Sequence, residues 1–483
     1  MRLEHRTPLL AVVGLALATI GLRLPFLGAP AGNDEAGFLI VARSWGTGSS
    51  LYGDYWVDRP PLLLWIFDAA GDLTTLRLLG CLAAGVTVVA VGAAVAVVAG
   101  PRVAPWAASA AAVFCASPWL GTVRVNGEIL AAPFVATSIL CTVLALRPQG
   151  RTLPWALASG VLATAAFGIK QSTIDPFVFA VVAAAVLALC QPTERRRAAL
   201  LVAGGVVAAL ATTAVLVLSA AARGTGAGAL FQAVVVFRFD AGQVIGSSAS
   251  SATDQRLVTL VSTWAVSGLA LLSLAILVLA ARRRRDPVVV ATAVTVVASS
   301  AVALLGGSYW AHYLIQLVPA VALGAGLVAV AVVPWVRWIG AGAFGIALVT
   351  TLSYAFVTGG QHESEAEDLG LAVRAASQPG DTMVVAYGQP NVLLAAGMDS
   401  PYEYLWSLPI RVRDPELTDL VEVLRGPDAP AWVVEWSDFD TWAVDASALK
   451  DAVDDAYRPV AAPCGHVVWL RDDLDRPPVT EDC

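Results

Sequence analysis

The sequence is poor in charged residues, which make up only 14% of its 483 positions. Soluble domains are about a quarter charged, so this composition excludes an ordinary soluble chain. Lysine occurs only at Lys170 and Lys450, and arginine carries nearly all of the positive charge. Together with abundant alanine, valine and glycine, this bias indicates a GC-rich bacterial genome.

Cysteine is also scarce, and none of the six cysteines has the spacing of a metal site. Four of them lie in apolar segments and are interpreted as packing residues: Cys81, Cys115, Cys141 and Cys190. Cys464 and Cys483 lie near the C-terminus, where pairing depends on whether that region faces an oxidising compartment. The sequence leaves this question open.

Long apolar runs dominate what is present, and 57% of all residues are hydrophobic. Runs of roughly 17–25 residues are long enough to cross a bilayer as helices. We therefore expect a polytopic α-helical membrane protein with about eleven spans. The expected spans are 8–27, 74–99, 103–119, 126–146, 153–170, 173–190, 198–222, 258–281, 287–306, 310–330 and 334–357. The first is interpreted as an uncleaved anchor.

Charge divides the chain into two unequal parts. Residues 1–357 carry 22 basic and 13 acidic side chains, whereas residues 358–483 carry 8 and 24. We interpret residues 1–357 as the transmembrane domain and residues 358–483 as a soluble domain with a net charge of −16, which makes nucleic-acid binding unlikely. Because arginine clusters fall in alternate loops, the positive-inside rule places the N-terminus in the cytoplasm and the soluble domain outside the cell.

The soluble domain alternates short helical and strand patterns, which indicates a small α/β layer. Helices are expected at 365–377, 391–397, 414–426 and 445–457, and strands at 382–388, 431–436 and 466–472. This region has no glycine-rich phosphate loop and no nucleophile elbow. We interpret it as a lid or an acceptor-docking module.

The first outer loop, residues 28–73, is unusually polar and aromatic. "NDEAGFLIVARSW" (33–45) has helical spacing of apolar residues, with Asn33 or Asp34 as the expected cap. "DRPPLLLWIF" (58–67) begins with two prolines, which suit the first turn of a helix. Both segments are expected to be helices lying in the membrane interface.

Ionisable residues from several outer loops gather on this same face of the membrane. Charges at a membrane edge are costly unless they are used, so the gathering predicts a functional site. Its members are Asp34, Glu35, Arg59, Arg124, Glu128, Lys170, Arg238 and His312. Local structural roles are the alternative: helix capping for Asp34, dipole stabilisation for Glu128, snorkelling for Arg59 and Lys170, and structural hydrogen bonding for His312.

Several segments resemble the GT-C glycosyltransferases of the protein O-mannosyltransferase and aminoarabinose transferase group. They are the Asp-Glu pair after the first span, the Tyr-Gly-Asp at 52–54, "DRPPLLLWIF", "VNGEILAAPFVATSILCTVLAL" (125–146), "FGIKQS" (167–172) and "HYLIQLVPAVALGAG" (312–326). The similarity spans most of residues 25–330. It implies an inverting transfer of a sugar from a polyprenyl-phosphate donor to an acceptor hydroxyl, without a metal or another cofactor.

The resemblance also implies roles for individual residues. Asp34 is the expected general base and Glu35 the second choice, or an orienter of the acceptor. The donor phosphate is expected to contact Arg59, Lys170, Arg238 and His312. The sugar or the acceptor is expected to contact Tyr55, Asp58, Asn126, Glu128 and Tyr313. Tyr55 alternatively belongs to a belt of interfacial aromatics.

Expected partners are the lipid-linked donor, a glycan, lipid or protein acceptor, and membrane lipid. A transporter or flippase of lipid-linked sugars and an inactive cell-envelope assembly protein are the alternative functions. The sequence does not identify the sugar or the acceptor.

Overall fold

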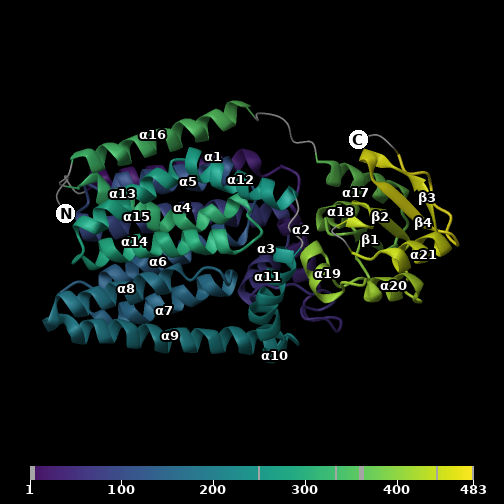
Figure 1. Ribbon diagram of the computed structural model, residues 1–483, viewed down its shortest axis with the longest axis horizontal. Coiled ribbons are helices and arrows are strands. Elements are labelled where there is room, and N and C mark those ends of the chain that lie inside the picture. The colour runs from purple at the N-terminus through teal and green to yellow at the C-terminus, as the bar shows by residue number, and fades with distance from the viewer. Residues whose placement is uncertain are drawn as a thin grey trace.

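The computed structural model describes residues 6–148, 150–247, 251–331, 334–357, 364–441 and 444–480. It consists of an elongated bundle of helices with a smaller, sheet-containing part at one end (Figure 1). Eight of the described helices are long and apolar enough to cross a membrane, or up to nine if one bent pair forms a single span. The protein is therefore a multi-pass membrane protein, as the composition predicts.

The helices of the bundle follow the expected apolar runs. They are α1 (Arg6–Arg23), α4 (Leu73–Ala99), α5 (Ala104–Ala116), α6 (Gly127–Ala145), α7 (Thr152–Ile169), α8 (Asp175–Cys190), α9 (Arg195–Ala221), α12 (Ser251–Val266), α13 (Leu269–Arg282), α14 (Pro287–Leu305), α15 (Val318–Ala329) and α16 (Pro334–Val357).

The exact count of eleven spans is not confirmed. The runs expected at 103–119 and 173–190 form α5 and α8, with 13 and 16 residues, which are shorter than the usual transmembrane length. The run expected at 258–281 is divided between α12 and α13, whose axes are bent by 62°.

The segment 223–257 falls between two of the expected spans, 198–222 and 258–281, yet much of it is helical. It contains α10 (Ala227–Phe231), a π-helical turn (Gln232–Val236) and α11 (Phe237–Ser247), and residues 227–247 pass the length and hydropathy test for a span. In Figure 1, α10 and α11 lie at the end of the bundle next to the sheet-containing part. This arrangement brings Arg238, in the first turn of α11, to that end.

Both helices expected in the first outer loop are present as α2 (Asn33–Ser44) and α3 (Pro61–Ala70). The expected cap of α2 is wrong, because Gly32 occupies the N-cap position and Asn33 is already helical. The amide of Gly32 donates to Glu35 Oε2 at 3.0 Å, so a carboxylate inside the helix closes its first turn.

The two ends of the bundle differ in charge. The starts of α1 and α16 lie at one end (Figure 1). The arginines 282–285, at the end of α13 and directly after it, lie there too, since Arg282 contacts Trp335 of α16. From there α16 runs along the bundle toward the sheet-containing part (Figure 1). The proposed boundary between residues 357 and 358 falls between α16 and α17 (Glu365–Ala376).

The C-terminal part is a four-stranded sheet with helices. Its strands, β1 (Met383–Ala386), β2 (Trp432–Glu435), β3 (Tyr457–Ala461) and β4 (Val467–Arg471), have the spatial order β1-β2-β4-β3. β1 and β2 are parallel, and β4 pairs antiparallel with both β2 and β3. Its other helices are α18 (Pro390–Ala396), α19 (Ser407–Arg413), α20 (Thr418–Arg425) and α21 (Ser447–Ala456).

Every expected element of this part is present, and two elements are additional. Nothing in the sequence analysis predicts β3, which carries Pro459 and lies at the edge of the sheet, where a proline is tolerated. The second is α19, which is only seven residues long. Cys464 is disulfide-bonded, and Cys483 lies outside the described residues.

Candidate functional site

A large cavity of about 1670 Å³ lies between the end of the bundle and the C-terminal part. One wall comes from the first outer loop and from the loops before α6, α8 and α15. Residues around α17, α18 and α19 form the other wall. The cavity therefore collects segments from nearly the whole length of the chain.

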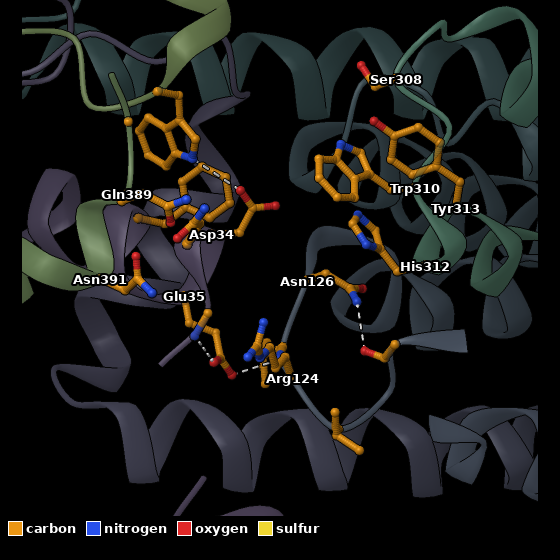
Figure 2. Close-up of a pocket in the computed structure, with 18 of the residues that line it drawn as sticks. Asp34, Glu35, Arg124, Asn126, Ser308, Trp310, His312, Tyr313, Gln389 and Asn391 are labelled. Atoms are coloured by element: carbon orange, nitrogen blue, oxygen red, sulfur yellow. Dashed lines mark hydrogen bonds between the residues drawn. The ribbon is translucent and has the colours of Figure 1, made fainter. Parts of the chain in front are cut away.

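The carboxylate of Asp34 lies at this cavity, in the first turn of α2. Its Oδ1 accepts a hydrogen bond from Trp406 Nε1 at 3.2 Å, and the side chain is half-buried. Figure 2 shows Asp34 and Gln389 on one side of the open space, with Trp310 and His312 across from them. A carboxylate in this position is accessible to a ligand in the cavity.

The carboxylate of Glu35, unlike that of Asp34, is surrounded by hydrogen-bond donors. Its Oε1 accepts from Arg77 Nε at 3.1 Å and from the amide of Val125 at 2.8 Å. Its Oε2 accepts from Arg77 Nη2 at 2.8 Å and from Gly32 N at 3.0 Å, and the residue is 1% exposed. This geometry argues against Glu35 as the second-choice base, because four donors already surround its carboxylate.

Asp58 holds two of the predicted phosphate-binding cations. Arg59 Nη1 contacts Asp58 Oδ1 at 2.7 Å, and Arg238 Nη2 forms an ion pair with Asp58 Oδ2. The Asp58 carbonyl also accepts from Gln171 at 2.7 Å. All three ionised residues line the cavity. Because both oxygens of the Asp58 carboxylate are paired with guanidinium groups, Asp58 positions Arg59 and Arg238. Neither oxygen is left free for a sugar hydroxyl.

Lys170, Glu128, His312 and Tyr313 form a second cluster. Lys170 Nζ pairs with Glu128 and lies 4.4 Å from the centre of the Tyr313 ring. His312 Nε2 lies 3.9 Å from Glu128 Oε1, and the rings of His312 and Tyr313 meet edge to face at 5.1 Å. Glu128 is 2% exposed and contacts both Lys170 and His312. Lys170, His312 and Tyr313 line the cavity, whereas Glu128 does not.

Two residues predicted to contact the sugar or the acceptor have other roles in the structure. Asn126 lines the cavity, but its Oδ1 caps α6 by accepting from Ile129 N at 3.0 Å. Tyr55 is 2% exposed, and its hydroxyl accepts from the amide of Ser400 at 3.0 Å. Burial raises the pKa of Tyr55 to about 12, and its contacts join the first outer loop to the C-terminal part.

The sequence analysis missed two cations of the cavity, Arg256 and Arg411, and did not assign Arg124 a contact. Arg256 Nε donates to the carbonyl of Ser308 at 3.1 Å, and its guanidinium lies 5.1 Å from the centre of the Trp310 ring. Burial lowers the pKa of Arg411, and the charge of Arg256 lowers it further. The C-terminal side of the cavity also contributes Trp406, Gln389 and Asn391, for which a single sequence offers no local signal.

Among the described residues, no group of three or more histidine, cysteine, aspartate or glutamate side chains is arranged to hold a metal ion. Metal independence therefore stays a prediction. The positive charge that the cavity offers to a ligand comes from arginine and lysine side chains.

No protein-family model and no curated protein matches the sequence. The fold is similar to that of ArnT from Cupriavidus metallidurans bound to undecaprenyl phosphate, with a TM-score of 0.62 and 14% identity over 95% of this chain and 97% of that one. It is also similar to the Archaeoglobus fulgidus oligosaccharyltransferase, with a TM-score of 0.58 and 13% identity over 97% and 75% of the two chains.

A further structure of that archaeal enzyme, AglB in complex with an inhibitory peptide and a dolichol-phosphate, has a TM-score of 0.56 and 15% identity over 99% of this chain and 75% of that one. These matches run through both the bundle and the C-terminal part. The fold of this protein is that of the GT-C glycosyltransferases, as the segments in its outer loops predict.

Proposed function

We propose that this protein is an inverting glycosyltransferase that moves a sugar from a polyprenyl-phosphate donor to an acceptor hydroxyl at the outer face of a bacterial plasma membrane. The observation that carries the proposal is the composition of the cavity. The half-buried carboxylate of Asp34 shares it with the cations Arg59, Arg238 and Lys170 and with the imidazole of His312.

These groups match what a direct displacement needs. Asp34 takes the proton of the acceptor hydroxyl as its oxygen attacks the anomeric carbon. The bond from that carbon to the phosphate oxygen breaks, and the departing lipid phosphate gains negative charge. Arg59, Arg238 and Lys170 stabilise that charge, and a single displacement inverts the anomeric centre.

The neighbours in fold support the class of donor. ArnT is described bound to undecaprenyl phosphate, and AglB is described with a dolichol-phosphate. Both ligands are polyprenyl phosphates, whose head groups suit a cavity at the membrane surface. The orientation rests on the arginine-rich links at the opposite end of the bundle, which the positive-inside rule assigns to the cytoplasm.

A transporter is less well supported by the distribution of charge. Transporter sites lie near the middle of the bilayer, whereas the cavity described above opens at one end of the bundle, beside the C-terminal part. We therefore retain the transferase as the function to be tested.

The test is transfer by the purified protein in liposomes that also contain the glycans, lipids and proteins of a bacterial envelope extract as acceptors, with a panel of undecaprenyl phosphates that carry different labelled sugars. Wild type is expected to release undecaprenyl phosphate from one donor of the panel and to form a product with the opposite anomeric configuration. Asp34→Asn is expected to lose at least a hundredfold in kcat while binding the donor normally. Wild-type turnover by Asp34→Asn would refute the assignment of the base.

A further inference from the structure

One side of α2 faces the C-terminal part, where it meets Trp406 and Pro390. Asp34, Gly37 and Phe38 are spaced i, i+3 and i+4, so they lie on the same side of the helix. The indole of Trp406, the residue before α19, lies across this side. Its Nε1 donates to Asp34 Oδ1 at 3.2 Å, and its ring centre lies 5.1 Å from that of Phe38.

The absence of a side chain at Gly37 permits this arrangement. A Cβ atom built on Gly37 would lie 2.3 Å from Cζ2 and 2.6 Å from Cη2 of the Trp406 ring, and 2.9 Å from Cγ of Pro390. Carbon atoms do not approach so closely, and an indole cannot bend away at its tip. Any larger residue at position 37 would therefore displace the tryptophan from Asp34.

Further contacts hold the C-terminal part against the first outer loop. Asn391 Nδ2 donates to the carbonyl of Ala31 at 3.3 Å, three residues before Asp34. The amide of Trp56 donates to the carbonyl of Glu403 at 3.0 Å, three residues before Trp406. The two partners of the Trp406–Asp34 hydrogen bond are thus each fixed by a neighbouring interdomain contact.

We propose that Trp406 is a positioning residue for Asp34, so that the C-terminal part completes the catalytic centre. This inference rests on the proposed function. The indole N–H holds Oδ1, which leaves Oδ2 to take the proton of the acceptor hydroxyl. The terminal torsion of an aspartate is broad and roughly two-fold, so a fixed donor on one oxygen selects the orientation of the other.

This role differs from that of a lid or an acceptor-docking module, which is what the sequence suggests for residues 358–483. A lid changes the access of substrates and therefore their KM. A positioning residue changes the geometry of proton transfer, where a misplacement of about 1 Å costs on the order of a hundredfold in rate. The two roles predict different kinetics for a change at Trp406.

The test replaces Trp406 by phenylalanine in the full-length protein, with the undecaprenyl-phosphate donor that gives turnover in the panel. Trp406→Phe keeps an aromatic ring on Phe38 and removes the N–H group. We expect kcat to fall about tenfold or more, while the KM for the donor stays within about twofold. Trp406→His, which returns a ring N–H group, is expected to recover part of the loss.

Trp469→Phe is the matched control, because Trp469 lies in β4 and does not line the cavity. Its buried Nε1 has no hydrogen-bond partner among the residues that the structure describes. This variant is expected to keep wild-type kcat and KM. Gly37→Ala tests the same contact from the side of α2 and is expected to lower kcat as Trp406→Phe does.

A wild-type kcat for Trp406→Phe, or a raised donor KM with an unchanged kcat, would overturn the inference. If Trp406→Phe does not fold, as judged by its melting temperature, the kcat values of Trp406→His and Gly37→Ala test the inference instead. Losses in kcat that are larger for Gly37→Ala than for Trp406→His support the role of the N–H group, and any other order overturns it. Failure of the proposed function is distinguishable, because the wild type would then turn over no donor of the panel, whereas an active Asp34→Asn protein would refute only the assignment of the base.

Discussion

Replacing Glu35 by glutamine distinguishes the role of Glu35 from that of Asp34, its neighbour in α2. Four donors converge on the Glu35 carboxylate: Arg77 Nε, Arg77 Nη2, Gly32 N and Val125 N, at 2.8–3.1 Å. A glutamine amide offers one acceptor oxygen, and its NH₂ group faces donors instead of accepting from them. Arg77, which is 3% exposed, would become a buried cation without its counter-charge.

Breaking a buried ion pair by removing one partner costs about 3–5 kcal/mol. For a chain of this size, with an unfolding entropy of about 1 kcal/mol/K, that cost corresponds to a drop in the melting temperature of about 3–5 °C. Differential scanning fluorimetry of the purified protein in detergent measures this drop, since the chain carries 15 tryptophans. We expect the Glu35→Gln protein that remains folded to retain most of its turnover.

Asp34→Asn is the control with the opposite signature. Asp34 is half-exposed and accepts from one indole N–H, so its melting temperature is expected to stay within about 2 °C of wild type while turnover is lost. A Glu35→Gln protein with a wild-type melting temperature and no turnover would refute this reasoning and would transfer the base to Glu35.

Two further predictions concern other ion pairs. Arg59→Met and Arg238→Met are each expected to lower kcat about a hundredfold in the liposome assay, because each removes a cation aimed at the departing phosphate. The double variant is expected to lose less than the product of the two, because both cations share Asp58, and full additivity would contradict that coupling. In the C-terminal part, hydrogen bonds from Arg476 hold the pKa of Asp381 below its ordinary value of 3.8. Its stabilisation is fully present above about pH 4 and is lost as the pH falls through the lowered pKa. Thermal unfolding between pH 5 and 2.5 is therefore expected to be less pH-dependent in Asp381→Asn, and an unchanged slope would count against this pair.

Local sequence patterns were sufficient for most elements of the fold. The apolar runs predicted the helices of the bundle, because hydrophobic length is a property of each segment alone. Pro60 and Pro61 marked the start of α3, and alternating patterns marked three of the four strands of the sheet. Span length was harder to predict, because apolar residues continue past the ends of helices such as α5 and α8.

The gathering of charge at one end was also predictable, since loop order and the arginine bias fix the side on which each loop lies. The side of the membrane assigned to each loop predicted that Asp34, Arg59, Lys170, Arg238 and His312 lie on one face, and in the structure all five line one cavity. The assignment of sides could not identify their partners, because Asp58 and Glu128 meet their cations through packing between distant helices.

Only the tertiary structure showed how different the surroundings of Asp34 and Glu35 are. Adjacent residues of a helix point about 100° apart, so one acid of the pair faces the cavity and the other faces Arg77 on α4. Trp406 reaches Asp34 from 372 positions away in the chain. Such a contact depends on how the bundle and the C-terminal part pack against each other. The complementarity of whole surfaces determines that packing, and no local pattern of residues contains it.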